Sequence, residues 1–479
     1  MKKFNRVFFW LVMLATILAA VTCAVNPVSG KKELMFFSEK AEIALGQNTD
    51  REIKQTYGIY QDKAMNDYVN GVGQKLAAFS FRPKLQFYFA VLDTPVINAF
   101  AAPGGFIYVT RGIMALMNSE AELANVLGHE IGHVDARHSV KRLSGTLLIS
   151  IGLLLGSALS EDIAKVAGLA GIGTQLLFLK FSRSDEYQAD SLGIQCARKA
   201  AYSPVEMVQF FSALENMSAD SGGSRLPNFL STHPLTKSRI AKVKEMLSSQ
   251  DVRLAVKKEN YLRQIDGLIY GDNPQQGFVE GRAFYHPELA FYFQQPADWA
   301  LENTPKQVVM TAKDGKAALV LQAEASELDL DEYAVTKAKE LGQAEMLEEN
   351  RRSISSFRSR HAWYKVPQEG KEPLLVRLTC IRKGGMIYSF SALSAYGDFN
   401  TYRDVFENSI HSFQELNDPR YLNRKPSRLT LVHAGGNQTL QGIFSSASVD
   451  RKMWKQLGVF NALGLEAVPE SGQLIKLVK

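Results

Sequence analysis

Residues 118–133 read Asn-Ser-Glu-Ala-Glu-Leu-Ala-Asn-Val-Leu-Gly-His-Glu-Ile-Gly-His, and this stretch decides the fold of the region around it. Ser119 followed by Glu122 is the pattern of a capping box, which predicts that a helix begins here. Apolar residues then recur at helical spacing and predict a buried stripe: Leu123, Val126, Leu127, Ile131 and Val134. On such a helix, His129 and His133 lie four residues apart and project from one face.

Two imidazoles on one helix face can share one zinc ion, with Zn–N distances of about 2.0–2.1 Å. Glu130 follows His129 directly, so its carboxylate can act as the general base on a water activated by zinc without itself binding the metal. The motif lies in an apolar, glycine-flanked helix, where unpaired polar groups are costly to bury. One zinc ion per chain therefore explains the pattern better than two chance histidines on a polar surface.

A catalytic zinc site needs a third protein ligand and one open position. The best candidates lie in residues 181–190, Phe-Ser-Arg-Ser-Asp-Glu-Tyr-Gln-Ala-Asp. Glu186 and Asp190 are four residues apart, so a second helix would point both carboxylates the same way. Glu186 can complete the ligand set, and Asp190 can orient a ligand histidine from behind. The alternative is a solvated acidic helix face.

His138 lies five residues after His133. On a continuous helix this spacing places it about 140° round the axis from His133. We therefore interpret His138 as a structural or exposed residue rather than as a ligand.

The combination of HExxH with a later ExxxD resembles metallopeptidase family forty-eight, the gluzincin group that includes HtpX-like and BepA-like proteases. Two further elements fit the resemblance. Residues 98–105, Asn-Ala-Phe-Ala-Ala-Pro-Gly-Gly, are similar to the family's edge strand beside the substrate cleft, although their composition alone reads as a loop between strands at 85–92 and 106–110. Ser231-Thr232-His233-Pro234 is similar to its SxHP element.

The resemblance covers residues 33–246 and implies a gluzincin fold with Glu186 as third ligand and Asp190 as an assisting acid. It also implies that His233 faces the zinc. There it would either stabilise the developing oxyanion or occupy the open position in a latent state. From the residues alone, His233 is a loop histidine before a proline.

The amino terminus has the layout of a secretory signal. Three basic residues precede an uncharged apolar stretch at 7–21, which predicts a signal peptide at 1–22. Cys23 then resembles the acylated cysteine of bacterial lipoproteins, although Thr22 departs from that pattern. Ala24 is similar to the outer-membrane sorting residue. Membrane attachment through acylated Cys23 at the periplasmic face of the outer membrane is the expectation; an uncleaved anchor and an ordinary signal are the alternatives.

A second apolar segment spans residues 143–179 and contains few charges. It is either a membrane hairpin or a set of helices that cover the cleft. Its glycines and serines favour close helix packing over a membrane span.

The chain of 479 residues is long enough for about three domains, and the sequence predicts an α+β protein. A mainly helical protease domain with a small sheet is expected at 33–270. A linker at 271–277 leads to an α+β domain of unknown role at 278–416. Two hairpins are predicted there: one turns at Asp314-Gly315, and the other at Lys383-Gly384-Gly385.

Residues 428–479 resemble a LysM-like βααβ module, for which peptidoglycan is a candidate partner. Its usual Gly-Asp-Thr is replaced, because Asn437-Gln438-Thr439 follows Gly436.

The net charge of +6 is spread along the chain and does not indicate a nucleic-acid partner. The sequence favours a zinc endopeptidase that hydrolyses misfolded or misassembled proteins of the bacterial envelope. The first alternative is a chaperone or assembly factor for outer-membrane proteins whose protease activity is held off. The second is a wall-binding protein with a degenerate site.

Overall fold

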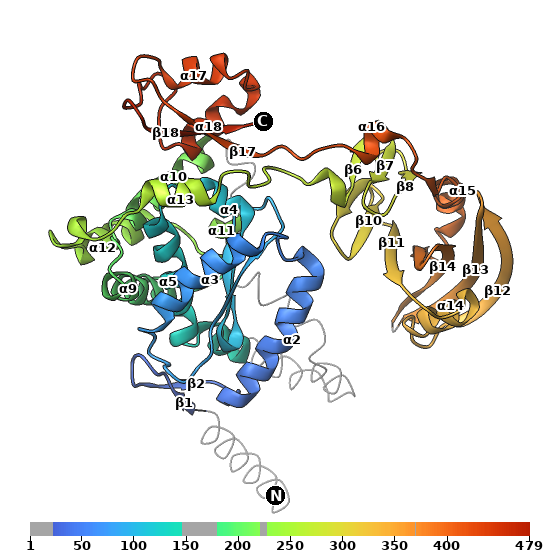
Figure 1. The fold of residues 1–479 in the computed structure, drawn as a ribbon. Helices are drawn as coiled ribbons and strands as arrows, with labels where there is room; N and C mark the ends of the chain where they lie inside the picture. The colour runs from blue at the N-terminus through green and yellow to red at the C-terminus, as the bar shows by residue number, and fades with distance from the viewer. Residues whose placement is uncertain (1–22, 146–179, 221–227, 369) are drawn as a thin grey trace, which may run out of the picture. The chain divides into compact units, whose positions relative to one another are not determined.

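The structure is a computed structural model, and it describes residues 23–145, 180–220, 228–368 and 370–479. The chain divides into two compact units (Figure 1): unit 1 comprises Met1–Gly271 with Ser427–Lys479, and unit 2 comprises Asp272–Pro426. A helical region with a small sheet precedes a β-rich region, so the predicted α+β class is confirmed. The predicted signal peptide and residues 146–179 of the apolar segment lie outside the described residues. None of the helices in the described ranges is both long and apolar enough to span a bilayer.

The described residues of unit 1 between 23 and 271 are mainly helical. Its helices in this range are α2 (Glu39–Tyr57), α3 (Lys63–Ala77), α4 (Arg111–Leu116), α5 (Glu120–Asp135), α9 (Arg183–Lys199), α10 (Glu206–Asp220), α11 (Asn228–Thr232), α12 (Lys237–Met246) and α13 (Lys258–Gln264). Its strands here are β1 (Cys23–Val25), β2 (Lys32–Leu34), β3 (Tyr88–Leu92), β4 (Ala99–Ala102) and β5 (Phe106–Thr110).

The small sheet of unit 1 has the order β3-β5-β4. β3 runs parallel to β5, while β4 pairs antiparallel with β5 and forms an edge. The interpretation of residues 98–105 as a loop, based on their composition, is therefore wrong, and the resemblance to an edge strand is confirmed. Gly104 and Gly105 adopt φ values of 75° and 94°, which glycine tolerates best, and they reverse the chain tightly enough for β4 to pair with β5.

The predicted helix around the HExxH motif is α5. The Ser119 hydroxyl accepts a hydrogen bond from the Glu122 backbone N–H at 3.1 Å, as a capping box requires. The Glu122 carboxylate, however, accepts from the Asn118 N–H at 3.0 Å rather than from that of Ser119. The predicted box is thus only half formed, because the carboxylate reaches one residue further back along the chain.

Glycines bring α5 and α9 into close contact. A Cβ added at Gly193 of α9 would lie 2.8 Å from the backbone nitrogen of His129, and one at Gly132 would lie 2.8 Å from the carbonyl oxygen of Ala189. Because real Cβ atoms do not approach backbone so closely, only glycine permits this helix spacing. The close packing holds Glu186 and Asp190 of α9 beside the histidines of α5.

The carboxy-terminal segment folds as β17 (Leu429–His433), α17 (Leu440–Ser446), α18 (Trp454–Phe460) and β18 (Leu474–Val478), with β17 antiparallel to β18. It belongs to unit 1 and shares one hydrophobic core with the helical region: Phe444, Leu457 and Ile475 are in the same cluster as Val126 of α5 and Phe210 of α10. The segment is therefore an integral part of unit 1.

Lys476 of β18 joins the carboxy-terminal segment to α4. Its side chain is fully buried, and its ammonium donates to the carbonyl oxygens of Ala115, Leu116 and Met117 at 2.9, 3.2 and 3.0 Å. A cation at a helix carboxy terminus satisfies carbonyls that have no partner inside the helix. Lys476 thus fixes the end of α4 immediately before the start of α5.

Replacing Lys476 with methionine should destabilise the protein by about 1–3 kcal/mol, because the buried carbonyls lose their donor while the stem volume is kept. Urea unfolding of the full chain measures this change. Lys452→Met, at an exposed lysine of the same segment, is the matched control and should leave the unfolding midpoint in place. Equal midpoints for the two variants would show that the Lys476 contacts add no stability.

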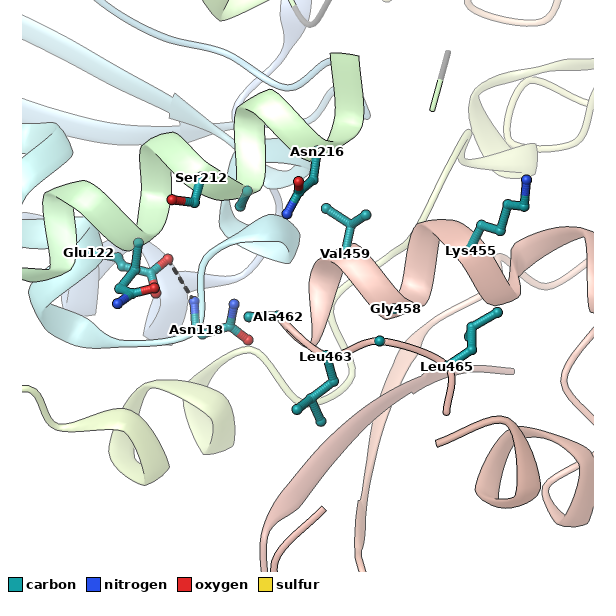
Figure 2. Close-up of a pocket in the computed structure, with 13 residues that line it drawn as sticks. Asn118, Glu122, Ser212, Asn216, Lys455, Gly458, Val459, Ala462, Leu463 and Leu465 are labelled. Atoms are coloured by element: carbon teal, nitrogen blue, oxygen red, sulfur yellow. Dashed lines mark hydrogen bonds between the residues drawn. The ribbon is translucent and has the colours of Figure 1, made fainter. Parts of the chain in front are cut away.

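A pocket of about 600 Å³ is lined by residues of α10, of α18 and of the start of α5 (Figure 2). Asn118 and Glu122 from the start of α5 line it together with Ser212 and Asn216 of α10. The opposite wall comes from α18 and the loop that follows: Lys455, Gly458, Val459, Ala462, Leu463, Gly464 and Leu465.

Unit 2 contains two antiparallel sheets. The larger has the order β12-β13-β14-β15-β11-β10-β9, and the smaller has the order β16-β8-β7-β6. The strands are β6 (Phe278–Glu280), β7 (Ala283–His286), β8 (Phe291–Gln294), β9 (Ala300–Asn303), β10 (Gln307–Thr311), β11 (Ala317–Ala325), β12 (Glu345–Ile354), β13 (Phe357–Gln368), β14 (Lys371–Lys383), β15 (Met386–Ala395) and β16 (Gln414–Glu415).

Both predicted hairpins of unit 2 are confirmed, as β10–β11 and β14–β15. The two longer helices, α14 (Leu330–Lys339) and α15 (Phe399–His411), pack in separate hydrophobic clusters, while α16 (Pro419–Leu422) is a single short turn. Tyr333 of α14 contacts the cluster that includes Leu378, and Phe406 of α15 contacts the one that includes Phe390.

Candidate metal centre

Four side chains from three parts of unit 1 converge on one point. His129 and His133 project from α5, Glu186 from α9, and His233 follows α11 directly. One ligand atom from each lies within 4.8 Å of all the others. All four residues are buried. The structure therefore brings together the three predicted ligands and the predicted facing histidine.

The ring nitrogens of this cluster are in close contact. His129 Nε2 lies 3.0 Å from His133 Nε2 and 3.2 Å from His233 Nδ1. Glu186 Oε1 lies 3.0 Å from His233 Nδ1 and 3.5 Å from His133 Nε2. Three imidazole nitrogens that face one another at such distances present lone pairs to a common point, which favours a cation between them.

Buried polar atoms without a hydrogen-bond partner, in and beside the cluster, also favour a cation there. Both carboxylate oxygens of Glu130 and Nε2 of His233 are buried and have no hydrogen-bond partner among the described residues. Buried polar groups normally have a hydrogen-bond partner, so buried atoms without one indicate a place where an ion or water binds. The donor set of imidazoles and a carboxylate suits zinc. The cluster is thus consistent with a metal site.

Glu130 lies at the rim of the cluster without joining it. Its Oε1 is 3.6 Å from His233 Nε2. Burial raises the pKa of Glu130 above its ordinary value. A carboxylate with a raised pKa beside a metal site is suited to accept and return a proton.

Asp190 binds the far side of a ligand histidine. Its Oδ1 lies 2.9 Å from His129 Nδ1, which leaves His129 Nε2 directed at the cluster. Arg239 donates to both Asp190 oxygens at 2.6 and 2.7 Å, and its Nη1 lies 2.5 Å from Glu186 Oε2. Burial alone would raise the pKa of Glu186, but the charges of His233 and Arg239 lower it well below its usual range.

Arg239 was not predicted from the sequence. It is 1% exposed, yet it lies in a stretch with three lysines that reads as an ordinary basic helix face. The only sequence signal is its place six residues after His233, and spacing alone does not predict which acids it will meet.

His138 is neither exposed nor remote from the cluster. It is buried, and its Nδ1 lies 2.9 Å from Nδ1 of His133. The prediction assumed a continuous helix, but α5 ends at Asp135 and Arg137 has a φ of 56°. This break interrupts the helix between His133 and His138, so the angle of about 140° for an unbroken helix does not apply.

Two phenylalanines enclose the centre. The ring of Phe181 lies 4.0 Å from that of His133, and the ring of Phe229 stacks on His233 at 4.7 Å. These apolar neighbours lower the local polarity, which strengthens the electrostatic interactions of the buried groups.

The comparisons with known proteins agree with this geometry. Residues 63–247 match the model of peptidase family M48. The chain is 29% identical over 230 residues to a beta-barrel assembly-enhancing protease of Yersinia pestis, an alignment that covers 46% of this chain and 47% of the relative. It is 30% identical over 209 residues to the protein of the same name in Escherichia coli strain K12, which covers 42% of each chain.

A mitochondrial metalloendopeptidase OMA1 of Schizosaccharomyces pombe is 29% identical over 233 residues, 47% of this chain and 67% of that protein. The chain thus spans about half the length of the first relatives it matches. The matched region contains the metal centre, with its HExxH helix α5 and the acidic helix α9. The family match to peptidase family M48 and the metal-site geometry thus fall in the same part of the chain, residues 63–247.

Proposed function

We propose that this chain is a zinc-dependent endopeptidase. The observation that carries the proposal is the buried convergence of His129, His133 and Glu186 beside the unpaired carboxylate of Glu130. Incubation of the purified chain with an unfolded protein, followed by mass spectrometry of the fragments, tests it. Internal cuts that disappear on chelation support the proposal, and the absence of internal cuts contradicts it.

In this mechanism His129, His133 and Glu186 hold the ion. Zinc, when bound, supplies a Lewis acid that polarises the scissile carbonyl and activates water. Glu130 accepts a proton from the attacking water while the water oxygen bonds to the carbonyl carbon. The same carboxyl then gives that proton to the leaving amine as the C–N bond breaks. Asp190 keeps the His129 ring in the orientation that directs Nε2 at the ion.

Strand β4 offers a surface for substrate backbone. Among the described residues no strand pairs with its outer side, and an added strand on a sheet edge is a mode by which many proteins bind extended peptides. A pocket of about 230 Å³ opens beside it, lined by Phe100 of β4, Val96, and Ser231 and Thr232 next to His233. We propose that an extended peptide pairs with β4 and places one side chain in this pocket.

The position of His233 in the cluster corresponds to a closed site, in which the protease is inactive. A catalytic zinc keeps one position open for water. Here one ligand atom from each of four side chains lies within 4.8 Å of the other three. We propose that His233 occupies the position that water needs and must withdraw before cleavage. The enclosure of its ring by Phe229 and Phe181 supports this closed arrangement.

Replacing His233 with alanine separates the two roles that the family resemblance implies. If His233 blocks the site, proteolysis should rise while zinc stays bound. If it stabilises the oxyanion, the rate should instead fall by about 10²–10³-fold. Fragment release and zinc content, measured on the same preparation, check the outcome. Loss of zinc together with activity would show His233 to be a permanent ligand.

We propose that the substrates are misfolded or misassembled proteins of the bacterial envelope. The support is the signal-like amino terminus and the similarity to proteases named for beta-barrel assembly. Acylation of Cys23, with attachment to the outer membrane, is part of this proposal. Mass spectrometry of the amino-terminal peptide from cells tests it, since an unmodified Cys23 excludes the anchor.

The chaperone alternative assigns client binding to the domains after residue 277, and most of these residues lie in unit 2. Unit 2 contains about a third of the chain and lies outside the family match. Peptidoglycan binding by residues 428–479 is a separate proposal. Because these residues share a core with the rest of unit 1, retention on purified peptidoglycan should be tested with the full chain. Lack of retention removes the glycan proposal.

A further inference from the structure

We propose that His138 and Gln188 fix the proton of His133 so that His133 can bind a metal. His138 acts through His133, and it is therefore a positioning residue. The inference rests on the proposed zinc site. It adds two residues that determine which ring nitrogen of His133 carries the proton. It follows from three distances along one chain of contacts.

The contacts run outward from the cluster in a line. His133 Nε2 faces the cluster, 3.0 Å from His129 Nε2. On the opposite side of the ring, His133 Nδ1 lies 2.9 Å from His138 Nδ1. His138 Nε2 then lies 3.0 Å from the side-chain oxygen of Gln188 on α9. The three histidines are each 1% exposed, whereas Gln188 is partly buried.

When His133 binds a metal through Nε2, one placement of protons makes both contacts, His133–His138 and His138–Gln188, hydrogen bonds. The ligand nitrogen Nε2 needs its lone pair, so the single proton of a neutral His133 must lie on Nδ1. That proton is donated to Nδ1 of His138, which must therefore accept. The proton of His138 is then on Nε2, where the Gln188 oxygen accepts it.

The opposite placement would disable the ligand. If His138 carried its proton on Nδ1, it would donate to Nδ1 of His133. The His133 proton would then lie on Nε2 and point into the cluster, where a metal needs the lone pair. The amide oxygen of Gln188, which lies 3.0 Å from His138 Nε2, disfavours this arrangement, because an oxygen can accept a proton from Nε2 but cannot donate one to it.

Of the acceptors near His138 Nε2, the Gln188 oxygen is closer than the charged carboxylate of Asp185. Asp185 Oδ1 lies 3.6 Å from His138 Nε2, beyond hydrogen-bond distance. The other oxygen of Asp185, Oδ2, accepts from the hydroxyl and backbone N–H of Ser182 at 2.6 and 3.1 Å, while the Lys141 ammonium lies 3.5 Å from Oδ1. The two histidines of α5 thus have different partners on the side away from the cluster. His129 contacts the carboxylate of Asp190, whereas His133 contacts His138, which in turn contacts Gln188.

The test measures zinc affinity of the purified full chain by competition with a chelator, in parallel with thermal unfolding. His138→Phe keeps a buried ring but removes the acceptor, and we expect zinc binding to weaken by about 10–100-fold. His138→Asn can place an oxygen near the position of Nδ1, and we expect it to restore most of the affinity. His286→Phe in unit 2 removes a histidine outside the cluster and should leave zinc affinity unchanged.

A purely structural role for His138 predicts a different pattern. His138→Phe would then lower the unfolding temperature without weakening zinc, or the Asn and Phe variants would lose zinc equally. Either result overturns the inference. If His138→Phe fails to fold, Gln188→Leu replaces it; weaker zinc binding is expected, and unchanged binding overturns the inference. If the unaltered chain binds no zinc, the proposed function fails and the inference fails with it.

Discussion

Replacing Glu130 with glutamine should reduce peptide-bond cleavage by about 10²–10⁴-fold while zinc remains bound. The amide has nearly the same shape as the carboxylate but cannot take a proton from water. Glu130 lies outside the group of four converging side chains, so the ligand set is unchanged. Both oxygens of its carboxylate are buried without a hydrogen-bond partner among the described residues.

Fragment release from an unfolded protein and zinc content of the same preparation are the measurements for Glu130→Gln. Glu215→Gln, an exposed glutamate of α10, is the matched control and should cleave normally. Near-normal cleavage by Glu130→Gln would assign the base elsewhere. In cells, the variant separates the two candidate functions: a purely proteolytic protein loses its effect, whereas a chaperone keeps part of it.

Replacing Glu186 with glutamine should weaken zinc binding by more than the roughly 10–100-fold that loss of an outer contact costs. The change removes the charged member of the ligand set and leaves an amide as a poorer donor. It also takes from Arg239 one of the two carboxylates that balance its buried charge. Breaking such a buried pair is destabilising, so the unfolding temperature should fall as well.

Glu206→Gln on α10 is the control for Glu186→Gln, because this carboxyl is also largely buried but contacts Ser119 rather than the cluster. Zinc affinity and thermal unfolding should both be recorded. A Glu186→Gln protein that binds zinc as tightly as the unaltered chain would exclude Glu186 as a ligand.

Local patterns in the sequence predicted the parts of the site that depend on helix geometry. The spacing of His129 and His133, and of Glu186 and Asp190, places each pair on one helix face, and the structure has both helices. The meeting of α5 with α9 depends on small residues, and the sequence marks these glycines without showing which helix they face. His233 was identified only through the family resemblance.

Features that depend on long-range packing could not be predicted in this way. Arg239 and His138 became part of the centre through tertiary contacts, and the latter through a break in helix geometry at Arg137. Lys476 is on a short carboxy-terminal strand, where a lysine usually faces solvent, yet here it is buried against α4. Neither periodicity nor composition distinguishes such a residue from its exposed neighbours.

The central claim is that His129, His133 and Glu186 hold one zinc ion. Metal analysis of the purified full chain tests it most directly. We predict about one zinc per chain in the unaltered protein and little or none in His129→Ala. Absence of zinc from a folded, unaltered protein supplied with the metal would contradict the account, as would equal zinc content in the two proteins.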